Sequence, residues 1–194
     1  AGDYASRLCV ETMVQSLEKS AHKTPVSLFE EAVTAANKAV FEESASHVEY
    51  EGMGTTVVAC TLEENTLYIA NIGDSRLYLI RDGIEQITDD HSLVEEMVKQ
   101  GNITESEARI HPQKNIITRA LGINEEVQAD FFEIDVEQGD VIMLCSDGLS
   151  NMIEDEDMEY IVKNSDTLQT AAESLVARAN ENGGNDNITV VLAE

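Results

Sequence analysis

The sequence predicts an α+β fold in which pairs of helices cover antiparallel β-sheets. Amphipathic helix patterns occupy both ends of the 194-residue chain. Between them lies a series of short segments rich in Val, Ile, Thr and Tyr, which is typical of strands. The strands are too many for one small sheet, and the helices have apolar faces to bury. We therefore expect a layered sandwich with helices outside and sheets inside.

Apolar residues at helical spacing predict the first helix pair. In residues 5–19 one face carries Ala5, Leu8, Cys9, Met13 and Leu17. In residues 27–46 a second face carries Phe29, Val33, Ala36 and Val40. Thr24-Pro25 interrupts the pattern between them, and two helices joined by so short a break can form an antiparallel pair.

The strand patterns that follow are separated by short turn signals rather than by helices. They occupy residues 55–62, 66–72, 75–80 and 84–88. Glu64-Asn65 and Gly73-Asp74 separate the first three, and Asp82-Gly83 is a strong hairpin signal before the fourth. This order predicts a meander of antiparallel strands.

A small helical insertion follows the meander. Residues 91–100 predict a helix that ends at Gly101, and Thr104 stands three residues before Glu107, which is the spacing of a capping box. We expect residues 90–115 to form a flap over a site. Later strands are predicted at 116–121, 127–135, 140–146 and 188–193, and helices at 155–163 and 167–180. Residues 1–194 therefore form a single predicted domain.

The net charge of −26 excludes some classes of partner. Nucleic acid and anionic membranes both require positive protein surface, so we expect neither. No apolar run approaches membrane-spanning length, and no signal-peptide pattern is present. The three cysteines have apolar neighbours and no metal-ligand spacing, which predicts buried thiols, a reducing compartment and a cytoplasmic location.

Three aspartates stand at the ends of strands that look fully buried. Asp74 lies at a strand junction, Asp147 follows the segment VIMLCS, and Asp186 precedes the segment ITVVLA. Hard divalent cations such as Mg²⁺ and Mn²⁺ prefer oxygen ligands, so these carboxylates are candidate metal ligands. Each also has a structural explanation, because Gly, Asn and Asp favour turns, and Gly73-Asp74 would then be a hairpin turn.

Five segments carry a resemblance to a known family. They are GMGTT (52–56), NIGDSRLY (71–78), ITDDHS (87–92), LCSDGL (144–149) and GGNDNITVV (183–191). In this order and spacing they resemble the PP2C-type (PPM) metal-dependent serine/threonine protein phosphatases, bacterial branch. The resemblance covers the whole chain and implies a four-layer α-β-β-α sandwich of two antiparallel sheets flanked by helix pairs.

The resemblance also implies an activity and a site. Members of the family hydrolyse phosphoserine and phosphothreonine in proteins with a water activated by two Mn²⁺ or Mg²⁺ ions. Asp147 and Asp186 match ligands of the binuclear centre, and Asp74 matches the carboxylate that, with Asp147, holds a third metal ion. Residues 90–115 match the mobile flap. The loops around the matched ligands contain Gly73, Gly148, Gly183, Gly184 and Asn187.

The chain departs from the family pattern at its start. The segment AGDYAS matches the part of the family that follows a DGMGGH-like motif, and no such motif occurs in these residues. We therefore expect an N-terminally truncated domain without the first strands, the bridging aspartate, one further ligand and the phosphate-binding arginine. On that basis we expect residues 1–194 to be impaired as a catalyst.

Other candidate catalytic side chains have less support. His22, His47, His91 and His111 are scattered, which argues against a zinc site. His91, at the start of the flap, could assist a leaving group, but the sequence favours a helix N-terminal residue hydrogen-bonded by Asp90.

A serine nucleophile and a phosphate-binding arginine are also disfavoured. Ser75 lacks the G-x-S-x-G context of a nucleophile. Arg76 and Arg119 lie in strand-like segments, where structural ion pairs are expected.

The function predicted first is hydrolysis of phosphoproteins, with a partner Ser/Thr kinase or anti-sigma-factor antagonists as candidate substrates. The alternative is a non-catalytic, phosphatase-like module that binds phosphoproteins or regulators. The third function class, an acidic cation-binding domain without catalytic ancestry, is the least favoured, because the five segments occur in the order of the family. If the first strands are absent, the exposed sheet edge predicts self-association.

Overall fold

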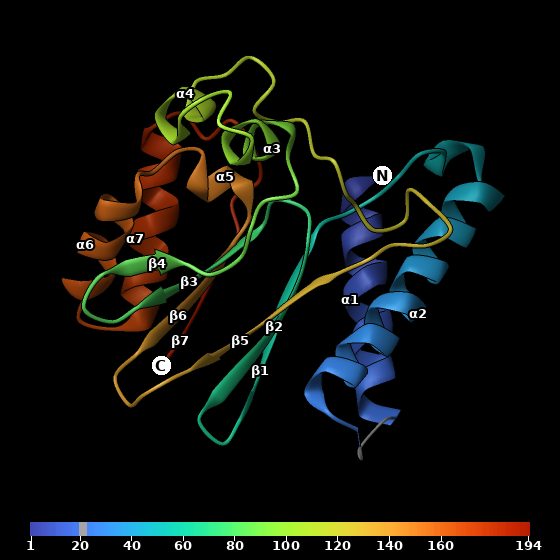
Figure 1. The fold of residues 1–194 in the computed structure, drawn as a ribbon, viewed down its shortest axis with the longest axis horizontal. Helices are drawn as coiled ribbons and strands as arrows, with labels where there is room; N and C mark the ends of the chain where they lie inside the picture. The colour runs from blue at the N-terminus through green and yellow to red at the C-terminus, as the bar shows by residue number, and fades with distance from the viewer. Residues whose placement is uncertain (20–22) are drawn as a thin grey trace.

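The computed structural model describes residues 1–19 and 23–194, so His22 lies outside the described residues. The described chain forms four layers, shown in Figure 1. One helix pair covers a first β-sheet, a second sheet packs against the first, and another helix pair covers the outer face of the second sheet. The predicted α-β-β-α sandwich is confirmed.

Both sheets are antiparallel. Within the described residues the first has three strands in the order β1-β2-β5, namely β1 (Val57–Glu63), β2 (Thr66–Ile72) and β5 (Asp130–Asp135). The second has four in the order β4-β3-β6-β7, namely β4 (Ile84–Gln86), β3 (Arg76–Ile80), β6 (Val141–Cys145) and β7 (Val190–Ala193).

The outer layers are the helix pairs α1 (Gly2–Lys19) with α2 (Pro25–Ser46) and α6 (Asp155–Lys163) with α7 (Leu168–Glu181). Thr24 caps α2 by accepting from the Ser27 N–H, and Pro25 occupies the first turn, where its missing N–H leaves no bond unmade. Shorter helices complete the chain: η1 (Val48–Tyr50), α3 (Leu93–Lys99), α4 (Glu105–Arg109) and α5 (Asp147–Ser150).

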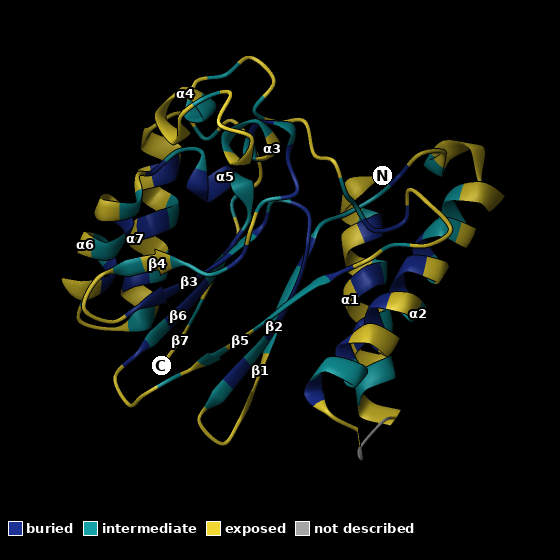
Figure 2. Cartoon of the chain, in the orientation of Figure 1, coloured by how far each residue is buried: buried dark blue, intermediate teal, exposed yellow. Residues whose placement is uncertain are grey.

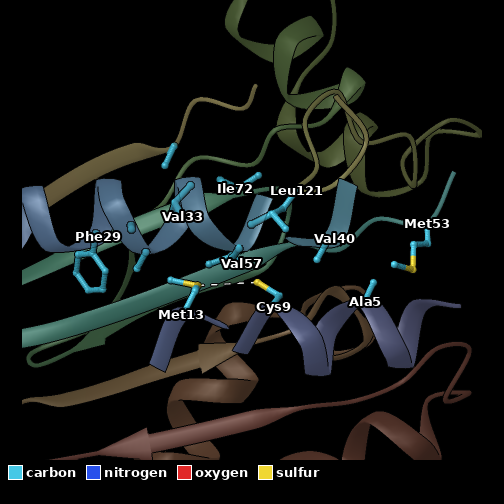
Figure 3. Close-up of a cluster of buried hydrophobic side chains, with 14 residues drawn as sticks. Ala5, Cys9, Met13, Phe29, Val33, Val40, Met53, Val57, Ile72 and Leu121 are labelled. Atoms are coloured by element: carbon cyan, nitrogen blue, oxygen red, sulfur yellow. Dashed lines mark hydrogen bonds between the residues drawn. The ribbon is translucent and has the colours of Figure 1, made fainter. Parts of the chain in front are cut away.

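Among the described residues, three hydrophobic cores hold the layers together. Figure 2 shows buried residues, in dark blue, on the helices and strands that face one another. The core between the first helix pair and the first sheet includes Cys9, Met13 and Phe29 (Figure 3). A second core lies between the sheets, and a third lies under α6 and α7. Because the cores surround the strands, the strand ends are fixed in space and can position side chains with little motion.

The meander prediction is wrong at its second connection. Glu64-Asn65 joins paired strands β1 and β2, as predicted, but β2 pairs with β1 and β5, whereas β3 pairs with β4 and β6. Gly73-Asp74 therefore carries the chain from one sheet to the other and is not a hairpin turn. Asp82-Gly83 does join two paired strands, β3 and β4, as expected.

Two further details differ from the sequence prediction, and one agrees. Residues 116–121 form only isolated bridges, Ser92 with Ile117 and Thr55 with Leu121, instead of a strand. Asp147-Gly148 opens the short helix α5, where the structural alternative to a ligand site was a strand-to-loop turn. The capping box of Thr104 and Glu107 is present at α4.

No helix among the described residues combines the length and the apolar composition needed to cross a lipid bilayer.

Candidate metal centre

Two of the predicted carboxylates lie at the same end of a strand pair. β3 and β6 are paired with Arg76 opposite Cys145. Asp74 stands two residues before Arg76, and Asp147 stands two residues after Cys145. Both side chains are half-buried. The fold therefore brings Asp74 and Asp147 to one edge of the second sheet.

The carboxylates lie close enough for their charges to affect one another's pKa. Burial, and next the negative charge of Asp147, raise the pKa of Asp74 to about 6. Burial, and next the charge of Asp186, raise the pKa of Asp147. The charge of Asp147 thus interacts with the charges of both other predicted ligands, Asp74 and Asp186. Such mutual repulsion is relieved when a cation lies between the carboxylates.

Asp186 lies farther from its strand than the sequence suggested. It belongs to the exposed loop before β7, which begins only at Val190. Ser146 nevertheless ties this loop to the end of β6: its Oγ donates to the Asn187 carbonyl at 2.9 Å and accepts from the Thr189 N–H at 3.0 Å. The Asp186 loop is therefore held beside Asp147.

Gly148 makes this close approach possible. A Cβ at Gly148 would lie 2.3 Å from the backbone oxygen of Asn187, which is too close for any side chain. This contact places Gly148 against the backbone of Asn187, and both residues were predicted in the loops around the carboxylates. Gly183 and Gly184 lie at the end of α7, where their N–H groups donate to the carbonyls of Asn180 and Ala179.

The donor set fits a hard divalent cation in kind. In the part of the chain that the structure describes, neither Asp74 nor Asp147 forms an ion pair, so both carboxylates are available to a metal ion. Asp147 accepts a long hydrogen bond, 3.3 Å, from Asn151. However, no group of three or more His, Cys, Asp or Glu residues in the described segments could hold a metal ion by itself. Within the described residues these carboxylates therefore stay candidate ligands and do not make a complete metal centre.

A cavity of about 550 Å³ opens beside these carboxylates. Asp74 and Asp147 lie on its wall, and the predicted flap, residues 90–115, contributes Glu95, Arg109 and Lys114. The beginning of α6 forms part of the lining. In Figure 1, α3 and α4 lie at the same end of the molecule as α5.

Arg109 connects the flap segment to the helix that starts with Asp147. Its Nη2 donates to the carbonyls of Ser150 and Ile153, at 3.4 and 3.3 Å, and forms an ion pair with Glu154 at 2.9 Å. Arg109 therefore joins α4 to the carboxyl-terminal side of α5. The sequence offered no signal for this contact, because the residues are distant along the chain.

His91 is buried, with 7% of its surface exposed. Its Nδ1 accepts from the Gly73 N–H at 2.9 Å, and its Nε2 lies 3.1 Å from Asp130 Oδ2. The expected contact with Asp90 is wrong, since Asp90 binds Arg76 through two hydrogen bonds of 2.9 and 2.8 Å. A role for His91 in assisting a leaving group stays a prediction.

The two arginines considered from the sequence are both in ion pairs. Arg76 pairs with Asp90, and Arg119 pairs with Asp130 at 2.6 Å. Burial opposes the ionisation of Asp130, but the hydrogen bonds from Arg119 and His91 outweigh it and lower the pKa of Asp130. The ion pairs expected for both arginines are confirmed. Asp130 was missed because it alternates along a strand like a surface residue.

Comparison with known proteins identifies the origin of this arrangement. A family model described as Protein phosphatase 2C matches residues 1–193. The chain belongs to the protein phosphatase 2C family. The family resemblance read from the five sequence segments is therefore confirmed.

Bacterial relatives of this protein phosphatase 2C chain are serine/threonine phosphatases. It is 39% identical over 199 residues to the serine/threonine phosphatase Stp of Listeria monocytogenes, covering 100% of this chain and 79% of that protein. It is 48% identical over 144 residues to the protein phosphatase PhpP of Streptococcus pneumoniae, covering 74% of this chain and 58% of that protein.

Solved structures of the family agree with the fold. The Mycobacterium tuberculosis serine/threonine phosphatase PstP/Ppp matches with a TM-score of 0.91 and 36% identity, over 98% of this chain and 80% of that one. The catalytic domain of PstP in complex with two manganese ions matches with a TM-score of 0.88 and 34% identity, over 98% of this chain and 80% of that one.

Proposed function

We propose that this chain forms the catalytic domain of a protein phosphatase that hydrolyses phosphoserine and phosphothreonine with Mn²⁺ or Mg²⁺. The observation that carries the proposal is the pair Asp74 and Asp147, half-buried on a cavity wall and without an ion pair in the described chain. The manganese-containing relative and the phosphatase family support it.

The chain's own residues supply binding and orientation. Asp147 would hold the metal together with Asp74 on one side and Asp186 on the other, because its charge interacts with both. When bound, divalent ions activate water as a nucleophile and neutralise charge on the phosphoryl oxygens. The cavity beside the flap segment gives the phosphorylated side chain a place next to these carboxylates.

The activity is tested with the protein expressed from its complete gene. We expect it to release phosphate from a phosphothreonine peptide with Mn²⁺ and to stop in EDTA. Asp147→Asn should lower the rate at least about 100-fold, because a lost ligand removes stabilisation made in the transition state. Asp157→Asn, an exposed carboxylate on α6, is the matched control and should leave the rate unchanged.

Two outcomes would contradict the proposal. Metal-independent hydrolysis, or a rate that Asp147→Asn leaves unchanged, would place the reaction elsewhere. Tight binding of the phosphopeptide without turnover would favour the alternative, a non-catalytic regulatory module.

Residues 1–194 on their own are proposed to be a poor catalyst. The described carboxylates make a partial site, whereas clamping two metal ions needs more ligands than these. We expect residues 1–194 to bind Mn²⁺ weakly and to turn over the phosphopeptide far more slowly than the Listeria monocytogenes phosphatase Stp measured beside them. Equal rates would show that these residues suffice.

We also propose phosphoprotein partners that include a Ser/Thr kinase, and a cytoplasmic location. The free thiols of Cys9, Cys60 and Cys145 support a reducing compartment. The location is tested by fractionation of cells that express a tagged copy; recovery of the protein outside the cytoplasm would contradict it. The kinase is tested by incubating its phosphorylated form with the phosphatase, and a kinase that keeps its phosphate is no substrate.

Self-association is a further proposal. Within the described residues, β1 pairs only with β2, and β7 pairs only with β6, so each presents an unpaired strand edge. Leu62 and Val191 on these strands are 58% and 54% exposed. Light scattering of residues 1–194 should therefore show a mass above the monomer at high concentration, and a constant monomer mass would contradict this.

A further inference from the structure

His91 fixes the backbone that carries Asp74. The Gly73 N–H donates to His91 Nδ1 at 2.9 Å, and the His91 N–H donates to the Gly73 carbonyl, also at 2.9 Å. Both backbone groups of Gly73 are thus bound to one residue. Asp74 is the next residue along the chain, so the orientation of its carboxylate depends on how Gly73 is held.

The hydrogen bonds define which nitrogen of His91 carries the proton. Because Nδ1 accepts from Gly73, a neutral ring must carry its proton on Nε2. Nε2 then donates to Asp130 Oδ2 at 3.1 Å. Arg119 Nη1 also lies 3.0 Å from Nε2, but this nitrogen donates to Asp130 Oδ1 and to the Gln128 carbonyl, which accounts for its two hydrogens.

Asp130, which binds His91 Nε2, lies in a different part of the fold from Gly73, which binds Nδ1. Asp130 is the first residue of β5 and pairs across the sheet with Asn71, two residues before Gly73. The His91 carbonyl also accepts from the Thr118 N–H at 2.8 Å, where the chain returns from the flap segment. His91 therefore links the strand β5, the base of the flap segment and the Gly73-Asp74 crossover.

Gly73 leaves little room for another arrangement. Its φ of +104° lies where side chains are rarely found, and a Cβ would stand 2.3 Å from Thr56 Cγ2. The crossover is thus packed against Thr56 on one side and bound to His91 on another. The backbone that leads into Asp74 is therefore restrained on two sides.

We propose that His91 is a positioning residue, whose imidazole holds Gly73 so that Asp74 faces Asp147 and the pair can bind a divalent cation. This inference rests on the proposed function, because it concerns the same carboxylates. His91 touches neither substrate nor metal in this account. Its effect passes through one hydrogen bond, from the Gly73 N–H to Nδ1.

Two substitutions test the roles of the two ring nitrogens of His91 independently. His91→Asn places an amide oxygen near the position of Nδ1 and can still accept from Gly73. His91→Gln places an amide nitrogen near Nε2, so it can still donate to Asp130. It loses the hydrogen bond that Nδ1 accepts from the Gly73 N–H. His47→Gln, at an exposed histidine after α2, is the matched control.

The readout is Mn²⁺ affinity, measured by electron paramagnetic resonance of free Mn²⁺ with the protein from the complete gene. We expect His91→Asn and His47→Gln to remain within about threefold of wild type, and His91→Gln to bind at least about tenfold more weakly. Equal affinities for both His91 variants, at equal thermal stability, would overturn the proposal, since a merely structural histidine does not distinguish its nitrogens in this way.

A second measurement needs no variant. Nitrogen-15 spectra of the wild-type imidazole should show His91 protonated at Nε2 and bare at Nδ1, and Mg²⁺ should shift the Gly73 and Asp74 amide signals. A proton on Nδ1 would overturn the inference even if both variants fail to fold. If Mn²⁺ binds wild type without involving Asp74 or Asp147, the proposed function fails instead, and the two failures are thereby distinguished.

Discussion

The two ends of the β3–β6 strand pair carry opposite arrangements of charge. At one end, Arg81 follows β3 and Asp140 precedes β6, and the two form paired hydrogen bonds of 2.8 and 2.7 Å. The Glu137 N–H adds a third bond to Asp140 at 2.7 Å. At the other end stand two carboxylates, Asp74 and Asp147, without an ion pair in the described chain.

The pKa values of the aspartates record this difference. Hydrogen bonds, first from Arg81 and then from Glu137, lower the pKa of Asp140 to about 2, whereas burial and Asp147 raise the pKa of Asp74 to about 6. We therefore expect the Arg81 end to stabilise the fold and the Asp74 end to destabilise it until a cation binds. A destabilising arrangement retained on a cavity wall is typical of a functional site.

Removing a carboxylate from the end that carries Asp74 and Asp147 should have the largest effect, a loss of metal affinity. Asp147→Asn removes the charge that interacts with both Asp74 and Asp186. We expect Mn²⁺ affinity to fall about 100-fold, equivalent to about 2.7 kcal/mol. Electron paramagnetic resonance of free Mn²⁺ measures this, with Asp157→Asn as the control. Unchanged affinity would separate Asp147 from the metal.

The next largest effect should be on stability, at the opposite end. Asp140→Asn leaves Arg81 without its charged partner, and hydrogen bonds to charged groups contribute about 1.5–3 kcal/mol. Because Arg81 is 37% exposed, water screens part of the loss, and we expect about 1–2 kcal/mol in the free energy of unfolding. Urea unfolding in EDTA measures it. A change below about 0.3 kcal/mol would show that the pair contributes little.

The same pair predicts a pH dependence. The pKa of Asp140 is about 2 in the folded chain and about 3.9 in an unfolded one, so its contribution is present above pH 4 and is lost as the pH falls toward 2. The stability difference between wild type and Asp140→Asn should therefore shrink between pH 4 and pH 2. Urea titrations at pH 7, 4 and 3 check this. A difference that grows on acidification would have the wrong sign.

A smaller, local effect is expected at the flap segment. Arg109→Ala removes the contacts of α4 with Ser150, Ile153 and Glu154. We expect amide hydrogen exchange in residues 104–112 to accelerate about tenfold, or about 1.4 kcal/mol of local stability, with little change elsewhere. Lys114→Ala, in the same segment, is the matched control. Equal exchange in both variants would remove Arg109 as the anchor.

The smallest effect should have the opposite sign. In EDTA, Asp74→Asn removes a half-buried charge that Asp147 repels, so we expect the free energy of unfolding to rise by about 0.5 kcal/mol. Thermal unfolding in EDTA measures the change. Destabilisation by more than about 1 kcal/mol would mean that Asp74 supports the fold, and the contrast between the two strand ends would fail.

The sequence predicted local features more reliably than the pairing of distant segments. The Thr104 capping box and the Asp82-Gly83 hairpin were correct because each depends on neighbouring residues. Gly73-Asp74 was mistaken for a hairpin turn because a tight turn and a crossover between sheets need the same residue types. Which sheet a strand joins depends on the packing of the cores, and no local pattern records that.

The candidate site follows the same rule. Asp74 and Asp147 were recognised from their positions at strand ends, and the fold brings them together through the pairing of β3 with β6. The partners of His91 could not be foreseen, since Asp130 lies 39 residues away and reads as a surface residue of a strand. Contacts that position the site thus come from tertiary packing, whereas the candidate ligands come from local sequence.

The difference between the two strand ends is tested most directly by melting temperatures measured with and without Mn²⁺. For wild type, Asp140→Asn and Asp147→Asn, each protein is melted once in EDTA and once in excess Mn²⁺. We predict that Mn²⁺ raises the melting temperature of wild type and Asp140→Asn by the same amount and raises that of Asp147→Asn much less. Equal stabilisation of all three proteins would contradict the account, because the metal would then bind without the carboxylates at the Asp74 end.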